Sequence, residues 1–126
     1  MNITGRLNNL RSAFAGREID GLFVTQADNR YYLSGFNGSA GYLFITGSKA
    51  VLATDFRYTE QAVSEAPEFE ILRIANNISE WFPSLVRDGR VTRLGFDASD
   101  VSYQFYQALT GALESKCVAV ELVPVS

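Results

Sequence analysis

Five aspartates are the residues of this chain that could hold a metal ion, and two of them, Asp55 and Asp97, each end a predicted strand. Carboxylate oxygens are the ligands that Mg²⁺ and Mn²⁺ prefer, so one interpretation of these residues is a hard-metal site. The sequence contains no histidine, which excludes imidazole ligands for zinc and the Ser–His and Cys–His nucleophile pairs. The candidate metal ligands are Asp20, Asp28, Asp55, Asp97 and Asp100.

The charge of the chain argues against the function that such a site would serve. An α/β domain with carboxylates at its strand ends is comparable with a ribonuclease H-type nuclease, which must attract phosphate. This chain has 11 Lys and Arg against 14 Asp and Glu, a net charge of −3, and no basic run. Aspartates at strand ends also commonly hold loops. We therefore expect no metal in this domain and no nucleic-acid partner.

A second group of candidate residues combines glycines with aromatic side chains. Gly35, Gly38 and Gly41 are spaced by three, which matches neither the dinucleotide-binding pattern nor a P-loop. We interpret them as residues that supply positive φ angles and close backbone approach in a tight loop. Tyr32 and Phe36 lie in the same segment, and exposed aromatic residues near an arginine are typical of interface hot spots.

Arg57 and Tyr58 follow a predicted strand and stand beside Asp55. In a purely structural interpretation, Asp55 caps the next helix and Arg57 forms a surface ion pair of little energetic value. In a functional one, a guanidinium and a phenol at a sheet edge bind a carboxylate or a partner domain. The three residues alone favour the structural interpretation, and the neighbouring aromatic residues favour the functional one.

Hydrophobic periodicity predicts alternating helices and strands along the chain. The first helix has its apolar face at Ile3, Leu7, Leu10 and Phe14, with Asn2 or Thr4 as its cap and Gly16 at its end. The last helix starts at Asp100 or Ser102, and its apolar face carries Val101, Phe105, Ala108, Leu109 and Ala112. Between and after them we expect strands at 19–25, 42–46, 50–54, 69–74, 93–97 and 117–123, and helical segments at 31–33, 57–66 and 79–86.

This order of elements predicts the fold class. Only three residues separate the strands at 42–46 and 50–54, so they should form an antiparallel hairpin. The other strands alternate with helices, including one capped by Ser79 in which Trp81 packs against the sheet and Pro83 lies in the first turns. We expect a three-layer α/β/α domain with a mixed, mostly parallel sheet covered by helices on both faces.

The composition is that of one globular domain spanning residues 1–126, with 47% hydrophobic and 20% charged residues. The single cysteine, Cys117, cannot form an internal disulfide, and its apolar surroundings predict a buried, unreactive strand residue. The amino terminus lacks the apolar stretch of a secretory signal, and no apolar run is long enough to span a bilayer. We expect a cytoplasmic protein that does not contact membranes.

Two segments of the chain carry distinctive motifs. The first is Asn29-Arg30-Tyr31-Tyr32-Leu33-Ser34-Gly35-Phe36-Asn37-Gly38-Ser39-Ala40-Gly41, and the second is Thr54-Asp55-Phe56-Arg57-Tyr58-Thr59-Glu60-Gln61-Ala62. Together they resemble the amino-terminal domain of the creatinase/prolidase family, most closely that of bacterial Xaa-Pro aminopeptidases. The earlier Asp20-Gly21-Leu22 also fits the family pattern, so the resemblance covers essentially the whole chain.

The resemblance implies a fold related to the ribonuclease H motif and a second, carboxy-terminal "pita-bread" metallopeptidase domain that this chain lacks. That second domain would hold two divalent metal ions, manganese or cobalt, through two Asp, one His and two Glu. The parent enzyme would remove the amino-terminal residue from peptides whose second residue is proline, using a metal-bridged hydroxide. This fragment itself would be inactive.

The same resemblance implies roles for particular residues. The domain would form part of a homodimer, contact its own catalytic domain and wall the entrance through which short proline-containing peptides pass. Tyr32, Phe36, Arg57 and Tyr58 would face the substrate entrance or the subunit interface. The loop would be shaped by Asn29, Gly35, Gly38, Ser39 and Gly41, with Asp55 holding Arg57 in place.

A free-standing module that binds a peptide or small ligand with this fold is the alternative function. The chain stops two residues after Pro124, directly past a predicted strand, which is typical of a boundary within a larger protein, although some natural domains also end on a strand. The sequence leaves open whether the parent is an aminopeptidase or a dipeptidase, because specificity would lie mainly in the missing domain.

Overall fold

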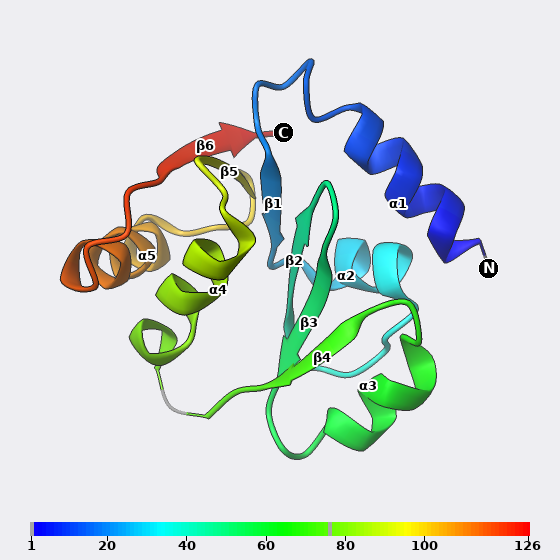
Figure 1. Cartoon of the computed structure of the whole chain (residues 1–126). Helices are drawn as coiled ribbons and strands as arrows, with labels where there is room; N and C mark the ends of the chain where they lie inside the picture. The colour runs from blue at the N-terminus through cyan, green and yellow to red at the C-terminus, as the bar shows by residue number, and fades with distance from the viewer. Residues whose placement is uncertain (1, 76) are drawn as a thin grey trace.

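A computed structural model describes residues 2–75 and 77–126 and shows one six-stranded sheet with helices on both faces (Figure 1). The strands are ordered β4-β3-β2-β1-β5-β6 across the sheet. Along the chain the elements are α1 (Ile3–Ser12), β1 (Gly21–Val24), α2 (Ala27–Ser34), β2 (Tyr42–Thr46), β3 (Ala50–Thr54), α3 (Thr59–Glu65), β4 (Glu70–Arg73), the 3₁₀ helix η1 (Ile78–Glu80), α4 (Phe82–Gly89), β5 (Arg93–Asp97), α5 (Tyr103–Ser115) and β6 (Glu121–Val125).

The sheet is mixed and mostly parallel, which confirms the predicted fold class. β2 pairs antiparallel with both β1 and β3, and β2 and β3 form the predicted hairpin. The remaining pairs, β1 with β5, β3 with β4 and β5 with β6, are parallel. At the hairpin turn of residues 47–49, the Thr46 hydroxyl accepts the backbone N–H of Lys49 at 2.9 Å, which closes the turn.

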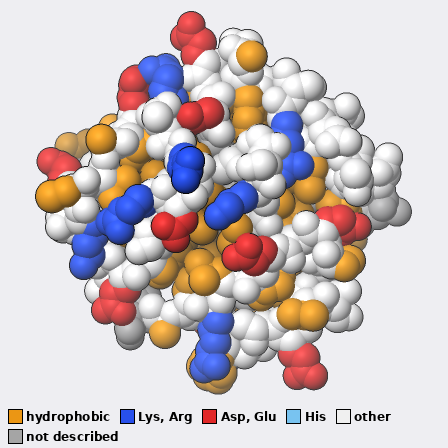
Figure 2. Space-filling model, viewed as in Figure 1, with side chains coloured by type: hydrophobic (Ala, Val, Ile, Leu, Met, Phe, Trp, Pro, Cys, Tyr) orange, Lys and Arg blue, Asp and Glu red, His pale blue; other side chains and the backbone are white. Residues whose placement is uncertain are grey.

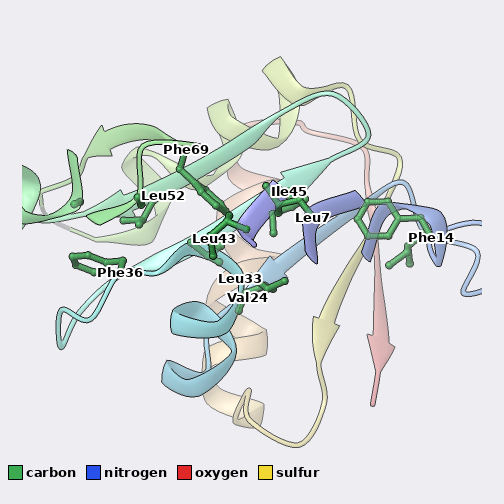
Figure 3. Packing of buried hydrophobic residues seen from close by; sticks show 13 residues of the cluster. Leu7, Phe14, Val24, Leu33, Phe36, Leu43, Ile45, Leu52 and Phe69 are labelled. Carbon is green, nitrogen blue, oxygen red and sulfur yellow. The ribbon is translucent and has the colours of Figure 1, made fainter. Parts of the chain in front are cut away.

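Successive side chains of the central strands point to opposite faces of the sheet and contribute to two separate hydrophobic cores. Leu43 and Ile45 of β2 point to the face covered by α1, α2 and α3, where they pack with Leu7, Leu33 and other residues of the first core (Figure 3). Phe44 between them points to the opposite face, which α4 and α5 cover. The strands are therefore buried on both sides, as the continuous apolar runs predict.

The second core is rich in aromatic rings. Phe23 lies 4.9 Å from Phe82 and 6.2 Å from Trp81, measured between ring centroids. Trp81 also lies 5.3 Å from Tyr42, so the predicted packing of Trp81 between helix and sheet is confirmed. Such tilted and edge-to-face pairs add to the stabilisation from burial.

Several predicted element boundaries were wrong for local reasons. α1 ends at Ser12 rather than at Gly16, although Phe14 in the following turn is still buried. The helix α4 follows a 3₁₀ turn in which Asn77, not Ser79, accepts the capping N–H. Of the alternatives for the first helix, Asn2 caps α1 by accepting the Gly5 N–H at 2.9 Å. Ser102 likewise caps α5, rather than Asp100.

The final strand starts four residues later than predicted, at Glu121. The predicted buried position of Cys117 was wrong: its side chain is exposed, and its backbone has a left-handed φ of 56° that a strand does not allow. Cys117 lies in the tight turn that follows α5, where its N–H binds the carbonyl oxygen of Glu114.

β6 lies at one edge of the sheet. The N–H of Glu121 donates to the carbonyl oxygen of Thr92, and the carbonyl oxygen of Val125 accepts the N–H of Ala98. The backbone groups of Glu121 and Val125 therefore point toward β5. Because backbone groups alternate in direction along a strand, Leu122 and Pro124 face outward.

Charged side chains of both signs are interspersed on the face shown in Figure 2, with hydrophobic side chains visible between them. Among the described residues, no helix has the length and apolar character needed to cross a membrane.

Candidate functional site

The loop between α2 and β2 is shaped by three glycines in two different ways. Gly35 ends α2 with a φ of 83°, and Gly41 has a φ of 158° at the start of β2, as the sequence predicts for positive-φ positions. Gly38 has no positive φ and instead allows close approach. A Cβ atom at Gly38 would lie 2.1 Å from Cζ of Phe36, so only glycine fits under that ring.

Arg30 holds this loop from inside, a role that the sequence analysis missed. Its Nη2 donates to the carbonyl oxygen of Gly38 at 2.9 Å and its Nη1 to that of Gly41 at 3.0 Å. Arg30 is only 4% exposed, and its Nε atom has no hydrogen-bond partner among the described residues. The spacing of Arg30 from buried Leu33 and Ser34 was a usable signal, because residues three and four apart share a helix face.

Asp55 and Arg57 form a two-point ion pair just after β3. Asp55 accepts from Nε of Arg57 at 3.0 Å and from Nη2 at 2.8 Å, and it also accepts the Arg57 backbone N–H at 2.9 Å. The hydrogen bond from Arg57 lowers the pKa of Asp55, and Asp55 raises that of Arg57. Asp55 does not cap α3, which was the structural interpretation. The helix begins at Thr59 without a side-chain cap, because Arg57 and Tyr58 form the preceding turn.

Tyr58 connects this ion pair to the glycine loop. A hydrogen bond joins its hydroxyl to that of Ser39, and its ring meets the ring of Phe36 edge-on, with centroids 6.3 Å apart. The guanidinium of Arg57 lies 5.2 Å from the Tyr58 ring centroid. Five of the candidate residues are thus in one connected cluster.

Phe36 is not the surface residue that the sequence predicted. Its side chain is 1% exposed because it fills the space between Gly38 and Tyr58 and packs into the first core. Arg57 remains accessible, with 61% of its side chain exposed. Phe36 therefore supports the loop, and the accessible groups of this cluster come from Arg57, Tyr58 and Ser39.

Tyr32 and Asn29 lie apart from that cluster. The Tyr32 ring is 54% exposed, and the guanidinium carbon of Arg6 lies 4.0 Å from its centroid. The Asn29 N–H donates to Oε1 of Gln26 at the start of α2. Tyr32 and Asn29 line a mostly apolar cavity of about 300 Å³ between α1, α2 and the ends of β1 and β5, together with Leu10, Phe14, Leu22, Val24 and Asp97.

A second, more polar cavity of about 530 Å³ lies beside the glycine loop. Thr25, which directly follows β1, lines both cavities, so the two adjoin at the end of that strand. The second cavity contains the loop-shaping candidates Ser39 and Gly41 and the ion-paired Asp55. The described residues that line it are Thr25, Arg30, Ser39, Ala40, Gly41, Tyr42, Thr54, Asp55, Ile74 and Ala75.

Three of the candidate metal ligands, Asp20, Asp97 and Asp100, make hydrogen bonds that hold loops, and Asp97 and Asp100 share the loop between β5 and α5. Asp20 accepts the backbone N–H groups of Thr92 and Arg93, Asp97 accepts the N–H of Ser99, and Asp100 accepts the Thr25 hydroxyl. Burial alone would raise the pKa of Asp20, but its hydrogen bonds outweigh this and hold the pKa below its usual range. Within residues 2–75 and 77–126, no three His, Cys, Asp or Glu side chains gather as a metal site requires.

Two relatives of known sequence resemble the chain over most of its length. The chain is 36% identical to the uncharacterized peptidase YqhT of Bacillus subtilis over 121 residues, which cover 96% of this chain and 33% of YqhT. It is also 36% identical over 107 residues to a probable Xaa-Pro aminopeptidase P of Phaeosphaeria nodorum, covering 81% of this chain and 15% of that protein. The chain thus spans at most about a third of these relatives.

Solved structures share the fold. The chain superposes on a Xaa-Pro dipeptidase from Bacillus anthracis with a TM-score of 0.92 and 34% identity, covering 99% of this chain and 34% of that one. It superposes on the N-terminal domain of the cytoplasmic peptidase PepQ from Mycobacterium tuberculosis with a TM-score of 0.86 and 36% identity, covering 97% of this chain and 93% of that one. The family model of the creatinase/prolidase N-terminal domain matches residues 6–126. By sequence and by fold, the chain belongs to the creatinase/prolidase N-terminal domain family.

Proposed function

We propose that this chain is the non-catalytic N-terminal domain of a Xaa-Pro aminopeptidase or dipeptidase, where it contributes to dimerisation and to the wall of the active-site entrance. The observation that carries this proposal is the coverage of the B. anthracis dipeptidase. Nearly all of this chain matches about a third of that enzyme, so the other two thirds have no counterpart here.

In this proposal a catalytic domain follows residue 126 in the parent protein and holds two divalent metal ions, manganese or cobalt. When bound, such metals supply the activated water for peptide hydrolysis. The described residues of this chain do not fit that role, because no three of their His, Cys, Asp or Glu side chains gather where they could hold a metal ion. The M. tuberculosis neighbour is described as a cytoplasmic peptidase, and we propose the same compartment for the parent protein.

The accessible groups at the carboxyl ends of the strands support an interface role. Phe56 is 67% exposed and lies between Asp55 and Arg57, with the guanidinium of Arg73 5.8 Å from its ring centroid. Aromatic and arginine side chains of this kind are enriched among residues that carry binding energy. Tyr32 is also exposed and lines the apolar cavity.

The test uses the full-length parent protein, obtained by reading the source gene beyond the codon for Ser126. Arg57→Ala and Phe56→Ser should each raise either the dimer dissociation constant or the KM for a Xaa-Pro peptide by about tenfold. Light scattering after size exclusion measures the first quantity, and steady-state kinetics measures the second. Tyr103→Ser is the matched control, because Tyr103 is a 75% exposed aromatic residue on α5.

Unchanged dimerisation and unchanged KM in both variants would sink the interface role. A natural stop codon after Ser126 would remove the catalytic domain from the proposal and leave a free-standing binding module.

A further inference from the structure

Arg30 is a buried cation that has no anionic partner in the part of the chain that the structure describes. The ion pairs found among the described residues join Arg57 to Asp55 and Arg93 to Glu121, and neither involves Arg30. Burial lowers the pKa of Arg30, and the nearby group that acts on its charge is the phenol of Tyr42. Two backbone carbonyls satisfy part of the guanidinium, but a buried charge without a counter-charge costs free energy.

This cation forms part of the wall of the polar cavity. The cavity lies just beyond the carboxyl ends of β1 and β3, at Thr25 and Thr54, and includes Tyr42 at the start of the antiparallel β2. In open α/β sheets, the space outside the carboxyl ends of the strands is where ligands bind. A volume of about 530 Å³ lies within the usual range for small-molecule sites.

The charges and donors around the cavity favour a single negative charge. Asp55 also lines the cavity, but Arg57 neutralises it through both carboxylate oxygens. Arg30 therefore leaves one uncompensated positive charge. The Thr54 hydroxyl already donates to the carbonyl oxygen of Ala40, whereas the Tyr42 hydroxyl has no hydrogen-bond partner within the described ranges.

We propose that this cavity binds one carboxylate group, attracted by the charge of Arg30 and hydrogen-bonded by the hydroxyl of Tyr42. Guanidinium groups match carboxylates in geometry and charge, and such hydrogen bonds are stronger than neutral ones. Nε of Arg30 has almost no solvent contact, so a direct bond to it requires a small shift of the loop at residues 37–41, whereas the charge attraction does not. The carboxylate belongs either to a free small molecule or to the carboxyl terminus of a short peptide.

This site does not depend on the proposed function, because the cavity and its charges lie entirely within the present chain. The M. tuberculosis structure consists almost wholly of the equivalent domain, which shows that a domain of this fold exists on its own. The 126-residue chain is therefore the material for the test.

The experiment is a nitrogen–proton NMR titration of this chain, observed at the Arg30 Nε–H and at the backbone N–H of Gly41. Sodium acetate, Ala-Pro and Ala-Pro amide are added in turn, with sodium chloride at equal ionic strength as the salt control. Ala-Pro should shift these signals saturably, and its amide and chloride should not. An equal response to acetate assigns the site to free small carboxylates, and a response to Ala-Pro without acetate assigns it to peptide termini.

Two tyrosine variants remove one hydroxyl each. Tyr42→Phe should raise the dissociation constant roughly three- to tenfold, the cost of one hydrogen bond, while its ring keeps its contacts with Phe23, Trp81 and Phe105. Tyr103→Phe, on α5, should leave it unchanged. If neither acetate nor Ala-Pro shifts the signals, or if chloride or the amide shifts them equally, the proposal is wrong and Arg30 serves only to hold the loop.

Discussion

The ring of Phe36 lies against the α-carbon of Gly38, two residues further along the chain. A Cβ atom added to Gly38 would come within 2.1 Å of Cζ and within 2.7 and 2.8 Å of two further ring carbons. Because Phe36 is buried and its ring packs against that of Tyr58, a shift of the Phe36 ring would also displace Tyr58. The identity of residue 38 and the position of the Tyr58 hydroxyl are thus physically linked.

Gly38→Ala should therefore lower the free energy of unfolding by about 2–3 kcal/mol, the upper range for overpacking a core. Urea unfolding followed by Trp81 fluorescence measures it. Gly47→Ala is the control, because a Cβ at Gly47 meets nothing within 4 Å. Combining Gly38→Ala with Phe36→Leu should recover part of the loss, and strictly additive effects would contradict the contact.

Substituting alanine for glycine should change the stability in opposite directions at two helix positions. Gly111 in α5 has open space around its α-carbon, so Gly111→Ala should raise the free energy of unfolding by up to about 1 kcal/mol through helix propensity. At Gly89, the last residue of α4, a Cβ would lie 2.7 Å from Cε2 of buried Phe44. Gly89→Ala should destabilise instead. Thermal unfolding of both variants measures these effects. A higher midpoint for Gly89→Ala would refute the packing at Gly89, and a lower one for Gly111→Ala would refute the helix-propensity argument.

Asp20 should make stability depend on pH in the acid range. Its pKa is lowered in the folded state, so the ionised carboxylate adds stability above its unfolded pKa of about 4, and that stability is lost as pH falls through the folded pKa. Asp20→Asn should lower the free energy of unfolding by ~1 kcal/mol at pH 7 and by less at pH 3. Urea unfolding at both pH values measures this.

Asp88→Asn is the matched control for Asp20→Asn. Asp88 is exposed on α4 and accepts no hydrogen bond from the described part of the chain, so its substitution should not lower stability at either pH. An Asp20→Asn loss of equal size at pH 7 and pH 3 would mean that ionisation of Asp20 is not the cause.

The left-handed backbone at Cys117 predicts a stabilising substitution. With φ at 56°, the Cβ atom is strained against the backbone, and glycine removes that strain. Cys117→Gly should raise the free energy of unfolding by about 1 kcal/mol, and Cys117→Ala, which keeps the Cβ, should not. A disulfide reagent should also label the exposed thiol of the native protein. Slow labelling that requires unfolding would contradict its exposed position.

Periodicity was sufficient to predict the sheet, because burial on both faces leaves continuous apolar runs in the sequence. The hairpin at Gly47–Lys49, the packing of Trp81 and the mixed sheet all follow from such local patterns. The error at Cys117 has a similar local origin. The stretch after α5 is apolar, but its first residues form the turn that leads into β6, and composition does not distinguish a turn from a strand start.

The candidate site was only partly predictable, because its geometry depends on contacts between distant segments. The pairing of Asp55 with Arg57 is local and could be proposed from the sequence. Whether Phe36 lies inside or outside depends on where Tyr58 packs, 22 residues later, and the sequence gives no measure of that. The buried position of Arg30 was not predicted for a related reason, because a charged residue is expected at the surface unless its partners are known.

Pro124 has a consequence for how copies of this chain meet one another. Leu122 and Pro124 are the β6 residues whose backbone faces away from the sheet, and proline carries no N–H group. Within β6 (Glu121–Val125), an incoming strand would find a single backbone donor, the N–H of Leu122, where an ordinary residue at position 124 would provide a second. Sheet extension from chain to chain is therefore disfavoured at β6, which protects the protein against growth into a cross-β ribbon at high concentration.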